Sequence, residues 1–126
     1  MRNLYLLIIL LVIISCNKDH YDYRDKIAGK YKCTYKHYYW EISADSLQIF
    51  TTIDTLIVSK NINNEIKILS NSFALDENWS FHWMGDGSNQ IDAQFFPDKD
   101  SISYFFSRGG LGGGYRAFYD GNKISE

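Results

Sequence analysis

The sequence is poor in the residues that build metal centres and disulfide frameworks. It has one proline, two cysteines and three histidines among 126 residues. His20, His37 and His82 lie in separate segments, without the HxH or HExxH spacing that places two ligands on one face. We therefore expect no metal site and no cofactor. The formal net charge is only −2, which argues against non-specific attraction to nucleic acid, so we expect no nucleic-acid partner.

Sequence signatures of catalysis are also missing. There is no Gly-x-Ser-x-Gly nucleophile elbow. The glycine-rich stretch 109–114 lacks the following helix and the Lys-Ser/Thr pair of a phosphate-binding loop, and it is better explained as a hairpin turn. The segment 86–90 has oxygen-bearing side chains at alternate positions, but it lacks the glycine at the sixth position and the terminal glutamate of a calcium loop, and it is better explained as a turn. We expect no catalytic residues, and the protein is not predicted to be an enzyme.

The longest apolar run covers residues 4–14. As a helix it would reach roughly 16 Å at about 1.5 Å per residue, which is half of the ~30 Å hydrocarbon core of a bilayer. Arg2 precedes the run and the small residue Ser15 follows it, which is the layout of a secretory signal peptide. The run therefore predicts a cleaved signal helix rather than a membrane-spanning helix.

The residue after Ser15 changes this interpretation. Ile13-Ile14-Ser15-Cys16 resembles a bacterial lipobox, although leucine is commoner than isoleucine at the position of Ile13. The resemblance implies cleavage after Ser15 and lipidation of Cys16, which would anchor the chain to a membrane. Two or three acyl chains make such an anchor stable, whereas one chain binds only reversibly. The alternative is an ordinary secretory signal followed by a chance cysteine.

The chain is thus divided into a lipoprotein signal peptide (1–15), a lipidated tether (16–26) and one domain (27–126). The tether is polar and aromatic and has no helical or strand period. The lipobox implies a location in the cell envelope, with the chain anchored to the outer membrane. Periplasmic and cell-surface placement both remain open.

The rest of the chain has the composition of a β protein, with short runs of Tyr, Phe, Ile and Thr broken by Asn, Asp and Gly. The segment 30–40 alternates strictly, with one set of side chains predicted to pack and the other to face water. The packing set contains Tyr31, Cys33, Tyr35, His37 and Tyr39. Cys33 has no cysteine left to pair with, and we interpret it as a small core residue.

About eight strands are expected, without a segment long enough for a crossover helix. An antiparallel meander that closes into a small barrel, or that folds into a two-sheet sandwich, would protect its own edges. We favour the barrel. A β-bulge is expected near Phe50 or Thr51, where the alternation is less strict.

Two further segments carry a family resemblance. Gly29 and Tyr31 open the first long strand as in lipocalin-like domains of small exported lipoproteins. The segment 100–124, with a strand, a glycine-rich turn, a second strand and Tyr-x-Gly-x-Lys, resembles the ending of small Bacteroidota lipoproteins. Together with the lipobox, these segments imply a small lipoprotein with a lipocalin-like all-β domain. The family is functionally uncharacterised, so the resemblance implies a fold and a location but no activity.

The sequence is rich in aromatic residues, with three Trp, ten Tyr and eight Phe. Rings that carry a polar group stack well on sugars and on apolar ligands. The candidate ligand-binding residues are Tyr38, Trp40, Trp79 and Trp83. The competing interpretation is that Trp79, Phe81 and Trp83 share one face of a strand and belong to the barrel core.

These features favour a noncatalytic binding or interaction module, whose partners would be a glycan, a lipid-like molecule or an envelope protein. The alternative is an inhibitor of lysozyme or of proteases, suggested by small size, β content and the segments 30–33 and 112–117, although the disulfide of such inhibitors is missing. The lysines Lys30, Lys32 and Lys36 share the wet face of one strand, and we interpret them as providing edge protection and solubility.

Overall fold

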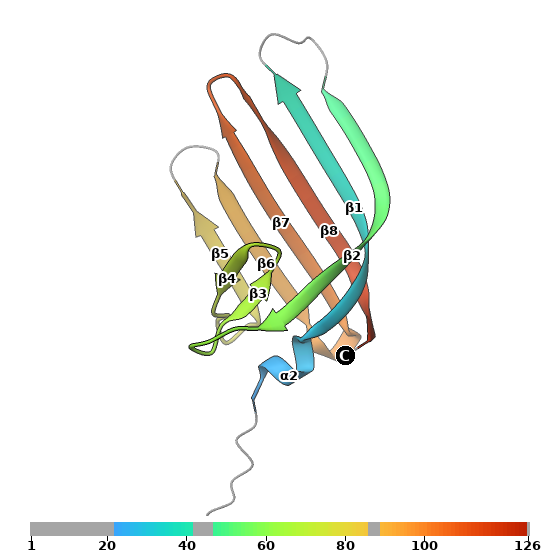
Figure 1. Ribbon diagram of the computed structural model, residues 1–126, viewed down its shortest axis with the longest axis vertical. Helices are drawn as coiled ribbons and strands as arrows, with labels where there is room; N and C mark the ends of the chain where they lie inside the picture. The colour runs from blue at the N-terminus through green and yellow to red at the C-terminus, as the bar shows by residue number, and fades with distance from the viewer. Residues whose placement is uncertain (1–21, 42–46, 86–88, 126) are drawn as a thin grey trace, which may run out of the picture.

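The computed structural model describes residues 22–41, 47–85 and 89–125 (Figure 1). The predicted signal peptide and Cys16 lie outside these residues. The described chain forms one short helix, α2 (Arg24–Ile27), a 3-10 turn, η1 (Pro97–Lys99), and eight strands. The strands are β1 (Gly29–Glu41), β2 (Gln48–Lys60), β3 (Ile66–Ile68), β4 (Asn71–Phe73), β5 (Ser80–Met84), β6 (Gln90–Phe96), β7 (Ser101–Gly110) and β8 (Gly113–Ser125).

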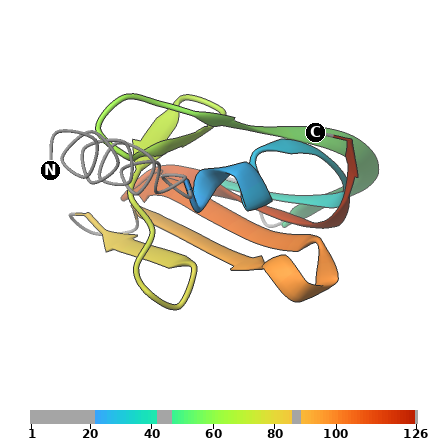
Figure 2. The same cartoon turned by 90° about the horizontal axis from the view of Figure 1, so that it is seen from below.

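All eight strands belong to one antiparallel sheet with the order β4-β3-β2-β1-β8-β7-β6-β5. Neighbours along the chain pair throughout, except that β1 pairs with β8 and that β4 and β5 form no ladder. Viewed end-on, the sheet curls so that β2 and β3 lie on one side of the interior and β5 and β6 on the other (Figure 2). The predicted all-β meander is confirmed, and of the two architectures that the sequence left open, the sheet is a nearly closed barrel.

The seam between β4 and β5 is bridged by side chains instead of backbone hydrogen bonds. Phe73 of β4 and Phe81 of β5 stack with ring centroids 4.3 Å apart and an interplanar angle of 12°. Nearby, the Asn71 amide nitrogen donates to the Tyr104 hydroxyl of β7 across the interior, at 3.0 Å. The ring pair joins the two end strands of the sheet, and the hydrogen bond joins β4 to the opposite wall.

One end of the barrel is plugged by α2 (Figure 1). Ile27 is buried in the core, and the Tyr31 hydroxyl donates to its carbonyl oxygen at 2.7 Å. Arg24 donates to the Asn61 carbonyl at 2.6 Å and holds Asp22 through two hydrogen bonds. The last part of the predicted tether, from residue 22 to residue 26, therefore packs against the body, because Arg24 finds carbonyl acceptors in the β2–β3 turn.

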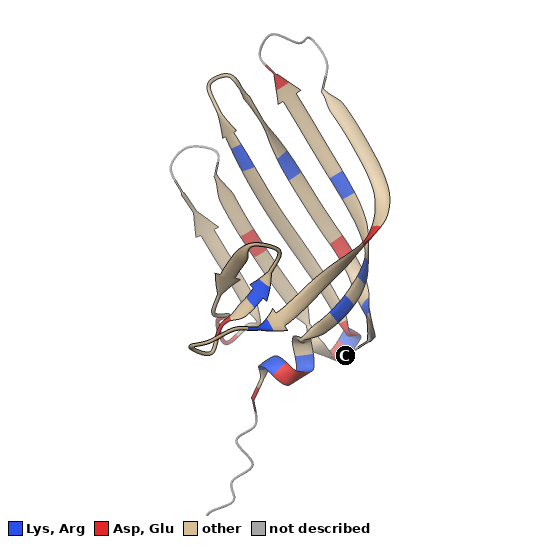
Figure 3. Cartoon of the chain, viewed as in Figure 1, with Lys and Arg blue, Asp and Glu red and all other residues tan. Residues whose placement is uncertain are grey.

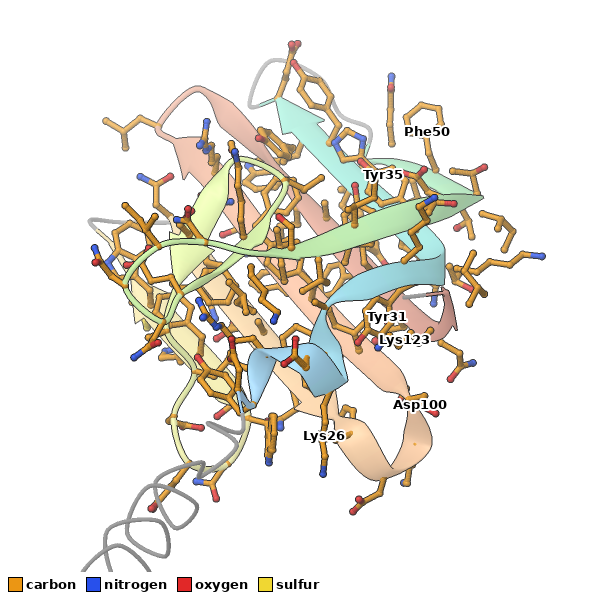
Figure 4. The ribbon with its side chains drawn as sticks, turned by 60° about the horizontal axis from the view of Figure 1, so that its bottom comes forward. Lys26, Tyr31, Tyr35, Phe50, Asp100 and Lys123 are labelled. Carbon is orange, nitrogen blue, oxygen red and sulfur yellow. The ribbon has the colours of Figure 1, made fainter. Side chains whose placement is uncertain are left out.

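The C-terminal strand joins the same plugged end. The Lys123 amide donates to the Asp100 carbonyl at 2.7 Å, and its ammonium group donates to the Lys26 carbonyl at 3.1 Å. Figure 4, which brings this end forward, shows Lys26, Asp100 and Lys123 around it and Phe50 away from it. The plug is thus tied to both halves of the sheet.

The opposite end is open, because two of its wall strands are short. β3 and β4 have three residues each, and β3 pairs only with Val58–Lys60 of β2. The segment from Gln48 to Thr55 is exposed on both faces. The expected alternation of buried and exposed residues therefore fails in this half of β2, since no strand covers its inner side.

The alternation predicted for β1 is confirmed in the first part of the strand and wrong at its end, where Tyr39 is exposed and Trp40 is half-buried. Tyr31 and Cys33 are buried, whereas Lys30 and Lys32 are exposed. The expected bulge near Phe50 or Thr51 is wrong, since the β1–β2 register is regular from Gly29↔Val58 to Tyr39↔Gln48. The register shift lies between β1 and β8, at Lys30 and Tyr31. Cys33 is a free cysteine with no exposed surface, as expected for a core residue.

Within the described ranges, none of the helices is long and apolar enough to cross a bilayer.

Candidate functional site

A cavity of about 460 Å³ lies at the open end of the barrel, between the β3–β4 turn and strands β5 to β8. This volume is within the range of about 300–1,000 Å³ of small-molecule sites. Its apolar wall is formed by one or two residues of each element, namely Leu69, Trp83, Ile91, Phe106 and Tyr115. Its polar side chains are those of Ser70, Asn71, Asn89, Ser107 and Arg108.

The wall residues face the cavity because alternate side chains of a strand point to the same face. On β7, Ile102, Tyr104, Phe106 and Arg108 pair with inward positions of β8 and share one face. The first two are buried in the core, Phe106 is half-buried, and Arg108 is exposed at the open end. The same face of the strand therefore changes from core to cavity wall along its length.

Aromatic rings continue from the cavity across the concave face towards β2. The ring of Phe106 meets that of Tyr115 edge-on at 5.5 Å, and Tyr115 meets His37 edge-on at 5.6 Å. Phe50 of β2 follows at 6.4 Å from His37, and Tyr35 lies 5.9 Å from it. These rings form a continuous surface over four strands, β2, β1, β8 and β7.

Two polar groups on this surface lack a partner. The His37 Nε2 atom is buried and has no hydrogen-bond partner among the described residues. Arg108 forms no ion pair within the part of the chain that the structure describes. A buried polar atom without a partner is costly, so a ligand that satisfies it gains free energy on binding.

Tyr104, whose hydroxyl accepts a hydrogen bond from the cavity residue Asn71, is only 1% exposed. Burial raises the pKa of this hydroxyl, and the hydrogen bond from Asn71 and the positive charge of Arg108 oppose this shift. The charge of Arg108 thus favours negative charge in its surroundings, and it would do the same for an anionic group of a ligand.

Of the four candidate binding residues, Trp83 lies in this cavity, with 46% of its surface exposed. Its indole lies over Gly85, where an added Cβ would approach the ring to 2.4 Å. Gly85 therefore leaves the space that this position of the indole requires.

Tyr38 and Trp40 lie elsewhere, on the outer face, with Leu47, Arg116 and Phe118 around a hollow of about 370 Å³. The Arg116 guanidinium already lies over the Trp40 ring, 5.4 Å from its centroid, and Tyr38 packs edge-on against Phe118 at 5.5 Å. The chain's own side chains thus make the stacking and cation–π contacts that a ligand would use there.

Trp79 is separated from both places. It precedes β5 with a positive φ of 62°. Trp79 and Phe81 are partly buried against the core, so the core interpretation is confirmed for these two residues, whereas Trp83 is exposed. The strand alternation starts only at Ser80, whose amide donates to the Asp76 carboxylate at 2.9 Å. The Trp79 ring packs edge-on against Tyr23 at 5.8 Å near the plugged end.

The structure adds Arg108, Phe106 and Tyr115 to the site, which were not among the predicted residues. The spacing of two residues from Ile102 to Tyr104, Phe106 and Arg108 was a signal for the first two, although Phe105 interrupts the alternation. In the described ranges, no group of His, Cys, Asp and Glu side chains could hold a metal ion.

Comparison with protein-family models, with curated proteins and with solved structures found no match for this chain.

Proposed function

We propose that the protein is a noncatalytic binding module of the cell envelope, which is anchored through Cys16 and holds an anionic amphiphile in the open end of its barrel. The observation that carries the proposal is the aromatic cavity with a cation, Arg108, that forms no ion pair with any described residue. Rings and aliphatic side chains favour an apolar body, and a guanidinium favours a carboxylate or a similar head group.

Among the ligands expected from the sequence, a lipid-like molecule is therefore favoured over a glycan. A sugar has hydroxyl groups on most of its edges and needs many polar partners. Of the polar side chains in the wall, Asn71 already donates to Tyr104, and Asn89 and Ser107 also interact within the chain. Ser70 and Arg108 are then the main polar groups left for a ligand. Glycans and uncharged alkyl chains then become comparison ligands.

Tryptophan fluorescence tests this proposal. In a variant with Trp40→Phe and Trp79→Phe, Trp83 is the only fluorophore of its kind. Dodecanoate is expected to change its emission in a saturable way, because the alkyl chain replaces water around the exposed indole. Short glycans are expected to give a smaller response. A flat response to fatty acids and glycans alike would overturn the proposal.

The charge of Arg108 supplies a second prediction. Arg108→Gln is expected to weaken dodecanoate binding by about tenfold, because a charge-assisted hydrogen bond contributes roughly 1.5–3 kcal/mol. Binding of dodecanol, which has no charge, should change little. Arg116→Gln, on the outer face, is the matched control and should leave both affinities unchanged. Equal losses for dodecanoate and dodecanol would contradict the assigned role of Arg108.

Anchoring through Cys16 has its own test. Cys16→Ser is expected to release the protein from the membrane fraction and to abolish incorporation of labelled palmitate, because the thiol that accepts the lipid is gone. Membrane pelleting of cells that express each form measures this. A Cys16→Ser protein that still pellets and still carries palmitate would contradict the anchor. α2 lies at the plugged end of the barrel (Figure 1), so the proposed anchor would leave the open end facing away from the membrane.

A further inference from the structure

A long free strand edge lies beside the cavity, on β2. β3 covers only Val58–Lys60, so the segment from Gln48 to Ile57 has β1 on one side and no paired strand on the other among the described strands. The other two free edges of the sheet are shorter, since β4 has three residues and β5 has five. β2 therefore carries the long unsatisfied edge.

The phase of the ladder identifies which backbone groups are free. The Asn61 amide donates to the Glu65 carbonyl at the β2–β3 turn. Because hydrogen-bonding residues alternate along an antiparallel strand, the odd-numbered residues of β2 direct their N–H and C=O groups away from β1. The Thr55 amide agrees with this phase, since it donates to the Asp54 side chain at 2.7 Å. Ile49, Thr51 and Ile53 thus present backbone groups to the open side.

This edge lacks most devices that keep strands from pairing. Between Gln48 and Ile57 there is no lysine and no proline, and Asp54 is the only charged residue. Ile49 and Ile53 are 56% and 61% exposed. A long apolar edge of this kind is a template for another strand.

The lysines next to the edge indicate what kind of strand fits. Lys32 is paired with Thr55 and Lys36 with Thr51. Both lysines are exposed, and neither forms an ion pair with a described residue. β1 is paired on both sides, so the interpretation of these lysines as edge protection is wrong. Figure 3 shows the basic residues along β1, next to a β2 edge that carries none.

We propose that the free edge of β2 binds an extended acidic polypeptide segment of a partner protein by strand addition. The added backbone would lie about 10 Å from β1, two strand spacings away. Lys32 and Lys36 reach over the small side chains of Thr55 and Thr51 to acidic residues at alternate positions of the added strand. Ile49 and Ile53 face apolar residues at the positions between them. This site is separate from the proposed cavity ligand and does not depend on it.

A synthetic peptide provides the probe. It is roughly nine residues long, the length that spans the edge at about 3.3 Å per residue. Glu and Ile alternate on one face and Thr fills the other. Calorimetry is expected to show binding of this peptide and at least about tenfold weaker binding of the same peptide with Lys in place of Glu, because the charges then repel. Amide hydrogen exchange at Ile49, Thr51 and Ile53 should slow on binding.

Two variants locate the site. The double change Lys32→Glu and Lys36→Glu is expected to reverse the preference, so that the Lys peptide binds and the Glu peptide does not. Lys67→Glu on β3 is the matched control and should preserve the original preference. Thr51→Pro removes a backbone donor that no ladder bond uses, so the fold should persist while binding of the Glu peptide falls by about tenfold.

Each other outcome overturns the proposal. If neither peptide binds the intact protein, the edge does not add strands. If the double lysine variant keeps its preference for the Glu peptide, the lysines do not select the partner. If sedimentation shows a dimer that Thr51→Pro dissociates, the occupant is a second copy of this chain. Arg108→Gln should leave peptide binding unchanged, which separates this result from the fate of the cavity proposal.

Discussion

Replacing Gly121 by alanine is expected to destabilise the barrel by about 3 kcal/mol, at the upper end of the cost of overpacking a core. Gly121 lies on β8 opposite Cys33 of β1 and Ile102 of β7. A Cβ at this position would approach the Lys32 carbonyl oxygen to 2.2 Å and the Cys33 Cα to 2.6 Å. Both are backbone atoms of a strand that is paired on its two sides, so they yield only if the sheet itself moves.

Urea unfolding measures this effect, with Gly110→Ala as the control. Gly110 is also a strand glycine, but an added Cβ there has nothing within 4 Å. Its replacement should change the free energy of unfolding by less than about 0.5 kcal/mol. If the two variants were equally stable, the close approach of β1 and β8 at Gly121 would be contradicted.

Raising the pH above about 9 is expected to destabilise the protein progressively. Burial raises the pKa of the Cys33 thiol to about 11, and it raises the pKa of Tyr31 and of Tyr119 to about 12. The unfolded chain therefore loses these protons at lower pH than the folded chain. Between pH 9 and 11 the folded state holds more protons, so stability falls as the pH rises. For the thiol alone the fall is about 2–3 kcal/mol, since one pKa unit corresponds to about 1.4 kcal/mol.

Urea midpoints measured from pH 7 to 11 test this expectation. Cys33→Ala has no thiol to titrate, so its stability should fall less steeply between pH 9 and 11, whatever its stability at pH 7. The native thiol should also resist a thiol reagent at pH 8 until urea unfolds the chain. A wild-type stability that stays constant from pH 8 to 11 would contradict the burial of these groups.

The sequence predicted those segments well in which the alternation of side chains along a strand alone decides which residues are buried. Tyr31 and Cys33 alternate with lysines, and both neighbours of β1 hold the strand in register, so the inner face was predicted correctly. In the sequence, Trp79 fits the two-residue alternation of Phe81 and Trp83, but its positive φ places it before the strand. The alternation of a strand says nothing about the residue at which the strand begins.

The open end of the barrel depended on lengths that no local pattern contains. Phe50 and Asp54 of β2 have the alternation of a buried face, yet they are exposed because β3 and β4 end after three residues. Arg108 continues the inward face of β7 and could have been included from the period. Its importance follows only from the cavity, which is a property of the assembled sheet.

The stacked pair of Phe73 and Phe81 has a consequence for motion. Separating β4 from β5 costs a ring contact of about 0.5–1.5 kcal/mol and the hydrogen bond from Asn71 to Tyr104, but no ladder bonds. Separating any other neighbours breaks a row of backbone hydrogen bonds. The barrel wall should therefore open at this seam before any other pair of strands separates, with the β3–β4 hairpin moving away from β5. Separation of the Phe73 and Phe81 rings would then limit the rate at which ligands enter and leave the cavity.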